Sequence, residues 1–174
     1  MQSPELNLVK NGTAVHDGWI LVREWTEDAA LPEGDCILPL AAWRQLRHTR
    51  RTETSQLAVW LAPEVDPAEL ADELAHLPLI AIDFPQFIDG RGYSIARLLR
   101  ERYNYQGELR AIGDIGQDQA HYLTQVGFNA LMPADRSKIA GIVQGITDFS
   151  DGYQASCLRQ EPYFRRRASL QKSL

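Results

Sequence analysis

Four short apolar runs, each followed by a segment with helical spacing, dominate the sequence from residue 57 onward. The runs begin near residues 57, 79, 109 and 128. Strands that alternate with helices in this way are parallel and joined by right-handed crossovers. Four such units are too few for an eight-fold barrel, so we expect an α/β fold with a mostly parallel sheet, either an open sheet or a partial barrel. In both, ligands bind beyond the carboxyl ends of the strands.

The spacing of the apolar residues locates the expected elements. The predicted strands cover residues 57–61, 79–84, 109–113 and 128–132, and the predicted helices cover 40–50, 66–77, 94–103, 117–126 and 137–149. Asp66 and Pro67 suit the N-cap and the first position of the second helix. At the N-terminus we expect an antiparallel hairpin over about residues 6–22, because Asn11-Gly12 is a strong two-residue turn signal.

The chain has 174 residues, of which 44% are hydrophobic, and this suits a single α/β domain over residues 1–157. Residues 158–174 carry five basic side chains and one acidic one, so this tail holds a charge of +4. Because the whole chain carries −5, residues 1–157 carry −9. We expect the basic tail to be poorly ordered, either as a solvated terminus or as a docking segment for an acidic partner.

Several classes of protein are disfavoured by the composition. No apolar run approaches the ~20 residues that a bilayer-spanning helix needs. The start, Met1-Gln2-Ser3-Pro4-Glu5, lacks the basic and apolar regions of a signal peptide. We therefore expect a cytoplasmic protein that contacts no membrane. The acidic net charge also argues against nucleic-acid binding.

No known cofactor motif stands out. The two cysteines, Cys36 and Cys157, cannot supply the four thiolates of an all-cysteine iron–sulfur cluster. The spacing of a Walker phosphate loop and the glycine fingerprint of a dinucleotide-binding fold are also absent. The four histidines are scattered and suggest no metal site. The cofactor, if there is one, is unknown from the sequence.

One candidate binding loop follows the predicted strand 79–84 and leads into a helix. It contains Asp89, Arg91, Gly92, Tyr93 and Ser94. Glycines and an arginine at a helix N-terminus can present backbone N–H groups and a guanidinium to sulfate, sulfite or phosphate, with Asp89 as an acid–base group. The alternative is a turn in which Ser94 caps the helix and Arg91 is solvated.

A second candidate loop follows the strand 109–113. Asp114 lies at the strand end, and Asp118 lies in the first turn of the next helix. Two acids at this spacing could act as general acid and base or hold a divalent metal. Alternatively, Asp114 makes a turn and Asp118 interacts favourably with the helix dipole.

Arg110 is a candidate anion-binding residue inside the sheet. Side chains alternate along a strand, so Arg110 and Asp114 share one face, and Asp83 lies near the end of the preceding strand. If the two strands are neighbours, we expect Arg110 to pair with Asp83 or Asp114, and such a pair often marks a functional site. The alternative is that Arg110 lies at an exposed strand start with only its stem buried.

Five segments together resemble a known bacterial family. They are Phe84-Pro85-Gln86-Phe87-Ile88-Asp89-Gly90-Arg91-Gly92-Tyr93-Ser94, Leu98-Leu99-Arg100, Gly107-Glu108-Leu109-Arg110-Ala111-Ile112-Gly113-Asp114, Asp118-Gln119 and Gly127-Phe128. The family is the bacterial domain-of-unknown-function family 934, whose members are described as probable oxidoreductases of sulfite reduction. The resemblance therefore implies a role in assimilatory sulfate or sulfite reduction, beside sulfite reductase or another enzyme of that pathway.

Three hypotheses about function follow. Reduction of sulfite to sulfide requires redox cofactors, because side chains do not carry such chemistry. An accessory or electron-delivery partner of sulfite reductase is therefore expected first. A small enzyme acting on a sulfur oxyanion or related anionic metabolite is the second hypothesis. A non-catalytic module that senses an anion is the third.

Overall fold

The apolar runs of the sequence form adjacent parallel strands. The computed structural model describes residues 5–48 and 55–147. Its strands β5 (Leu57–Leu61), β6 (Leu79–Phe84), β7 (Glu108–Gly113) and β8 (Ala130–Pro133) pair in parallel, in chain order. Crossovers between them carry the helices, so the predicted α/β fold with a mostly parallel sheet is confirmed.

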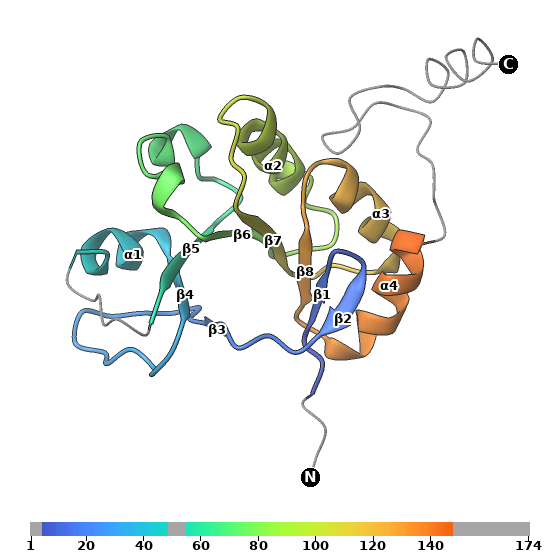
Figure 1. Ribbon diagram of the computed structural model, residues 1–174, viewed down its shortest axis with the longest axis horizontal. Helices are drawn as coiled ribbons and strands as arrows, with labels where there is room; N and C mark the ends of the chain where they lie inside the picture. The colour runs from blue at the N-terminus through green and yellow to red at the C-terminus, as the bar shows by residue number, and fades with distance from the viewer. Residues whose placement is uncertain (1–4, 49–54, 148–174) are drawn as a thin grey trace, which may run out of the picture.

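The sheet has eight strands in the order β2-β1-β8-β7-β6-β5-β4-β3 and curls into a half-barrel (Figure 1). The two edge strands, β2 and β3, do not pair with each other. This is the partial-barrel form of the expected fold. The four α-helices of the described residues lie on the outer side of the curve. They are α1 (Leu40–Leu46), α2 (Arg91–Glu101), α3 (Gln117–Gln125) and α4 (Ile139–Thr147).

Apolar side chains fill both faces of the sheet. The larger core lies between the sheet and the helices and includes Phe84, Leu99 and Phe128. A smaller core occupies the concave face, where Ile112 and its buried neighbours pack against Trp60. The five buried residues of this cluster are 0–1% exposed, so the middle of the concave face is packed within the chain itself.

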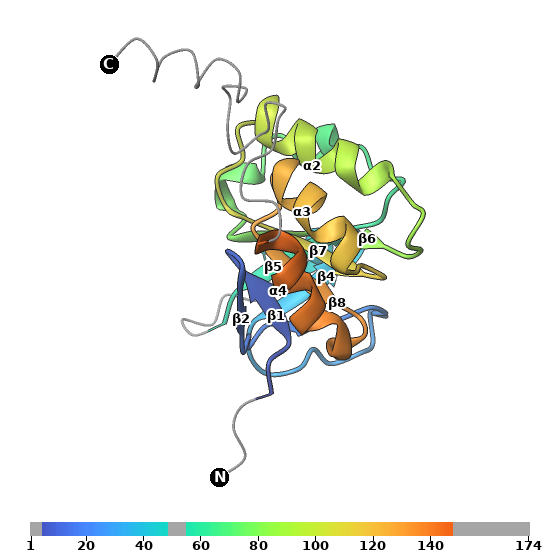
Figure 2. The same cartoon turned by 90° about the vertical axis from the view of Figure 1, so that its right-hand side faces the viewer.

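The N-terminal hairpin is shorter than the predicted range. β1 (Leu8–Lys10) and β2 (Thr13–Val15) are antiparallel, and the turn between them places Asn11 and Gly12 at φ values of 50° and 81°. Positive φ at both positions is typical of the turn that Asn-Gly favours. β1 also pairs antiparallel with β8, and α4 packs beside this hairpin (Figure 2).

β3 (Ile20–Leu21) lies at the opposite edge of the sheet, where it pairs in parallel with β4 (Cys36–Pro39). The chain between β2 and β3 runs along the open side of the half-barrel (Figure 1). The residues after the hairpin therefore join the two edges of the sheet. β4 itself was not predicted, because four residues that pass directly into a helix leave little periodicity to detect.

The segment 66–77 differs from the predicted α-helix. It forms two short 3₁₀ turns, Pro67–Leu70 and Leu74–His76. The expected cap is present, since the Ala68 N–H donates to Asp66 Oδ1 at 2.9 Å. Pro78 disfavours helical geometry at the residue before it, which accounts for the extended conformation of Leu77 at the end of the second turn.

Other expected bounds also shift, and α2 runs from Arg91 to Glu101 instead of over residues 94–103. The first predicted helix ends at Leu46, the last strand begins at Ala130, and a 3₁₀ turn at Arg136–Lys138 precedes α4. Cys157 and the basic tail 158–174 lie outside the described residues. Within the described ranges, none of the helices has the length and apolar character needed to cross a membrane.

Candidate functional site

Three strand ends meet at one rim of the half-barrel. β6, β7 and β8 end at Phe84, Gly113 and Pro133. The Asp114 N–H donates to Phe84 O, and the Ala134 N–H donates to Gly113 O, both at 2.8 Å. Gly113 has φ +106°, and a Cβ there would lie 2.4 Å from Phe84 O, so only glycine fits this junction. This rim is where the fold predicts a ligand site.

Asp89 and Arg91 are brought together at the start of α2. The Arg91 backbone N–H and Nε donate to Asp89 Oδ1 at 3.1 and 3.0 Å, and Arg91 Nη2 lies 2.6 Å from Asp89 Oδ2. Arg91 Nη1 also contacts Glu64 Oε1 at 3.0 Å. Hydrogen bonds from Arg91 hold the pKa of Asp89 below its usual value. The chain's own carboxylate therefore lies at the helix start that we expected an external anion to use.

Gly92, Tyr93 and Ser94 follow in the first turn of α2. Gly92 is buried, and a Cβ there would lie 2.6 Å from the Phe84 ring, so this glycine allows the helix to approach the sheet. The half-buried Tyr93 ring packs against Phe84 and Tyr122, with centroids 5.2 and 5.0 Å apart. Burial raises the pKa of the Tyr93 hydroxyl. Ser94 is exposed, and Gly90 is the N-cap in its place.

Asp114 connects two rim loops. Its Oδ1 accepts from Lys138 Nζ at 2.9 Å, and its Oδ2 accepts from the Phe87 N–H at 3.2 Å. The hydrogen bond from Lys138 lowers the pKa of Asp114. Asp118 is exposed in the first turn of α3, where a carboxylate is favourable. The contacts of Asp114 thus run to the loop before α2 and the start of α4.

The loop between β6 and α2, residues 85–90, presents two apolar side chains to solvent. Phe87 is 45% exposed and Ile88 is 86% exposed. The backbone beneath them is held in place, because Gln119 Nε2 donates to Phe87 O at 2.9 Å. Gln119 is itself buried and accepts from the Gly116 N–H at 3.1 Å. No functional role was predicted for Phe87 and Ile88, although two adjacent apolar residues in a loop can be recognised in the sequence.

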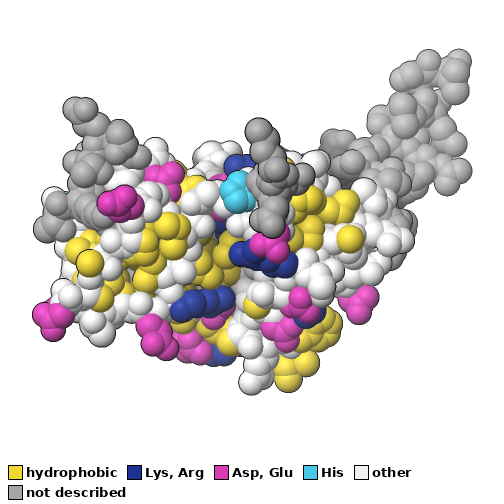
Figure 3. All heavy atoms as spheres, turned by 90° about the horizontal axis from the view of Figure 1, so that it is seen from below, with side chains coloured by type: hydrophobic (Ala, Val, Ile, Leu, Met, Phe, Trp, Pro, Cys, Tyr) yellow, Lys and Arg dark blue, Asp and Glu magenta, His cyan; other side chains and the backbone are white. Residues whose placement is uncertain are grey.

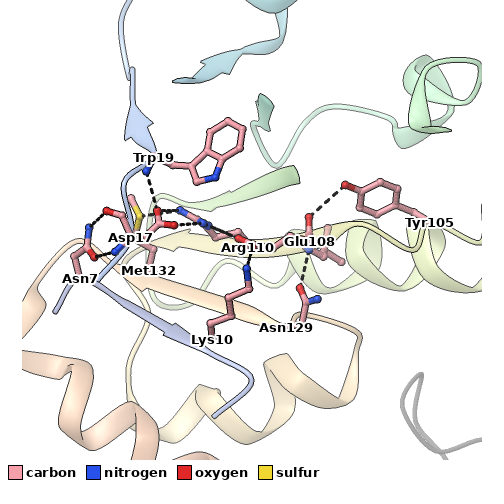
Figure 4. A network of polar contacts seen from close by, with 10 residues as sticks. Asn7, Lys10, Asp17, Trp19, Tyr105, Glu108, Arg110, Asn129 and Met132 are labelled. Atoms are coloured by element: carbon pink, nitrogen blue, oxygen red, sulfur yellow. Dashed lines mark hydrogen bonds and ion pairs between the residues drawn. The ribbon is translucent and has the colours of Figure 1, made fainter. Parts of the chain in front are cut away.

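Arg110 is fully buried on the concave face. Its side chain bonds to Asp17, Glu108 and Met132 (Figure 4). Its Nη1 lies 2.7 Å from Asp17 Oδ2, and its Nη2 lies 2.6 Å from Glu108 Oε1. Lys10 Nζ meets the second oxygen of Glu108 at 2.7 Å. We call Lys10, Asp17, Glu108 and Arg110 the concave-face network. The expected exposed position of Arg110 with a buried stem is wrong, because burial is complete.

The expected partners of Arg110 are also wrong. β6 and β7 are neighbours, as required, but Asp83 pairs with Arg23 at 2.6 Å and Asp114 pairs with Lys138. Arg110 lies in the amino-terminal half of β7 and so pairs away from the rim. Glu108 was predictable as a neighbour, because alternation places it on the same face as Arg110. Asp17 was not, since 93 residues separate it from Arg110.

The concave-face network fixes the chain that follows the hairpin. The Asp17 N–H donates to Asn7 Oδ1 at 2.7 Å, and the Trp19 N–H donates to Asp17 Oδ2 at 3.3 Å. These contacts bind the path from β2 to β3 to the middle of the sheet (Figure 4). On the face seen in Figure 3, acidic and basic side chains lie beside each other among apolar ones. Such a mixed surface is typical of internally satisfied ion pairs.

No group of three or more histidine, cysteine, aspartate or glutamate side chains is placed to hold a metal ion within residues 5–48 and 55–147. Two of the three predicted acid–base residues form ion pairs with a cation, and the third, Asp118, is exposed. Asp89 has Arg91, and Asp114 has Lys138. Paired carboxylates of lowered pKa are ionised at neutral pH and are poor proton donors.

The fold and the rim define a half-barrel α/β domain with internally paired charges at its strand ends. The family model described as "Bacterial protein of unknown function (DUF934)" matches residues 58–164. The chain belongs to this bacterial family. The match spans β5 to α4 and so includes the rim loops and Arg110. No curated protein and no solved structure matches the chain.

Proposed function

We propose that this protein acts in the cytoplasm, in assimilatory sulfite reduction, as an accessory partner of sulfite reductase. The pathway is supported by the resemblance of the chain's motifs to a family whose members are described as probable oxidoreductases of sulfite reduction. The chemistry supplies the accessory role, because the reduction needs redox cofactors and the chain has two cysteines and no known cofactor motif. An accessory protein delivers electrons, inserts a cofactor or assists assembly of the enzyme that carries out the reduction.

The observation that supports the accessory role is the combination of ion-paired carboxylates and exposed apolar side chains at the rim. Its loop carboxylates Asp89 and Asp114 are occupied by Arg91 and Lys138, while Phe87 and Ile88 are left exposed. Apolar side chains at a ligand-binding rim favour contact with a protein over acid–base chemistry on a small anion. The same pairing weighs against an enzyme that uses Asp89 or Asp114 on a sulfur oxyanion.

Growth of a strain that lacks the gene tests this proposal. The strain is supplied with sulfate, sulfite, sulfide or cysteine as its sole sulfur source, with and without the wild-type gene. We expect failure on sulfate and sulfite and growth on sulfide and cysteine, with rescue by the gene. Equal growth on all four sources would contradict a required role at the sulfite step.

A further inference from the structure

We propose that the rim loop, residues 85–90, is a docking surface for a partner protein that offers an apolar socket bordered by lysine or arginine side chains. Phe87 and Ile88 are the residues that enter the socket. This inference deepens the proposed function and rests on it only for the identity of the partner. The exposure of Phe87 and Ile88, the hydrogen-bonded backbone beneath them and the acidic charge around the loop support this proposal.

Phe87 and Ile88, at the tip of the rim loop, expose apolar surface that the packing of the fold does not need. Ile88 is the most exposed of the large hydrophobic side chains in the described part of the chain, at 86%, and Phe87 is next to it. The interior of the half-barrel is filled by other residues, so neither side chain is needed to complete a core. Adjacent exposed apolar side chains at the ligand-binding rim of an α/β fold are typical of interaction sites.

The backbone of the loop is held although its side chains are free of the core. Phe87 donates its N–H to Asp114 and accepts at its carbonyl from Gln119. The Asp89 N–H donates to Gln86 O at 3.0 Å, which closes the turn around the tip. Lys138 in turn holds Asp114. A loop that is ordered before binding loses little conformational entropy on docking, so its exposed side chains contribute more of their burial energy to affinity.

The charge around the tip indicates the character of the partner. Glu64, Asp89, Asp114 and Asp118 lie on the segments that border the loop, against Arg91 and Lys138, and both cations are engaged in ion pairs with these acids. Residues 1–157 carry a net charge of −9. A basic border on the partner therefore complements the rim and speeds association. The same acidity repels anionic lipid, which favours a protein over a membrane.

Leu98 provides a matched control. It is 39% exposed on α2, so its substitution removes a comparable apolar side chain outside the rim loop. The variants are Phe87→Ser, Ile88→Ser, their double variant and Leu98→Ser. Circular dichroism and thermal unfolding establish that each variant is folded before binding is measured.

The probe is purified sulfite reductase holoenzyme from the source organism, immobilised for biolayer interferometry with the full chain in solution. We expect each single rim variant to weaken binding at least tenfold, with a larger loss in the double variant. Leu98→Ser should stay within about twofold of the wild type, because it lies outside the docking surface. Raising the salt concentration should slow association, because the complementary charges are screened.

Four results would overturn the inference. Equal binding by rim variants and wild type would place docking elsewhere and leave the accessory role standing. If the wild-type protein does not bind the reductase, although the deletion strain still needs the gene for growth on sulfite, the role in the pathway stands and this docking is rejected. Loop-dependent dimers in sedimentation velocity, or loop-dependent binding to phosphatidylglycerol vesicles, would assign the tip to a second copy or to a membrane.

Discussion

Arg110, in the middle of the sheet, lies 2.7 Å from Asp17, in the segment that leaves the N-terminal hairpin. The pair is almost entirely removed from solvent, and Glu108 shares the guanidinium. A buried guanidinium with two carboxylate partners has its charge compensated in the interior, where an unpaired charge is most costly. The contact also fixes the path by which the chain reaches the opposite edge of the sheet.

Removing the guanidinium should destabilise the protein strongly. Arg110→Met leaves two nearly buried carboxylates, Asp17 and Glu108, without their common partner, and we expect a loss of about 3–5 kcal/mol in the free energy of unfolding. Urea unfolding at neutral pH measures the loss. Arg97→Met is the control, since its ion pair with Glu101 is half-exposed on a helix and worth about 0.3–0.5 kcal/mol. Equal stabilities for the two variants would show that the buried network contributes little.

Gly92 and Gly90 form a second matched comparison. A Cβ at Gly92 would lie 2.6 Å from the Phe84 ring, so Gly92→Ala should cost about 1–3 kcal/mol through overpacking. A Cβ at Gly90 meets nothing closer than 4.0 Å, and Gly90→Ala should cost less than about 1 kcal/mol. Thermal unfolding of both variants tests the packing role. An unchanged stability of Gly92→Ala would contradict the packing role and leave the anion-binding hypothesis as the explanation of this glycine.

Arg91→Ala separates the accessory role from the anion-binding hypotheses. In the structure, Arg91 is engaged with Asp89 and Glu64, so we expect the variant to restore growth of the deletion strain on sulfite. Immunoblotting should show that its level matches the wild type. If a stable Arg91→Ala protein behaved like an empty vector, Arg91 would be binding a substrate or effector anion.

The pairing of Asp89 predicts a specific pH dependence. Its pKa is lowered in the folded protein, so its contribution to stability is present above the unfolded pKa, near 4, and is lost as the pH falls through the folded value. Asp89→Asn should therefore unfold at lower urea than the wild type at pH 7. The difference between the two midpoints should shrink at pH 3 and in high salt. A difference between the midpoints that stays constant with pH would show that the charge of Asp89 does not cause the effect.

Much of the fold follows from local patterns. Leu79–Phe84 and Glu108–Gly113 are buried strands whose apolar runs are visible in the sequence, and Asn11-Gly12 determines its own turn. A strand was also expected at residues 19–22, where β3 forms, but as part of the N-terminal hairpin, whereas β3 pairs in parallel with β4. β4 was not predicted, because four residues are too few to show a period. The path from the hairpin to the far edge depends on Asp17 meeting Arg110, which no local pattern encodes.

The candidate site was predictable in place but not in its pairing. Asp89 and Asp114 do lie in rim loops and Arg91 lies at the adjoining start of α2, as expected from strand ends. Which cation each carboxylate meets depends on how the crossovers stack, and Lys138 reaches Asp114 only because β8 lies beside β7. The exposure of Ile88 likewise depends on the core being completed by other residues.

The most direct measurement of the accessory role is sulfide formation from sulfite by extracts of the deletion strain. It is made with the physiological electron donor and, separately, with reduced methyl viologen. We predict lowered activity with the physiological donor, which is restored when the gene is returned. Normal activity with viologen alone would indicate that the protein delivers electrons. Lowered activity with both donors would indicate that it assists assembly of the reductase. Unchanged activity with both donors, or sulfide formation by the purified chain without the reductase, would contradict the account.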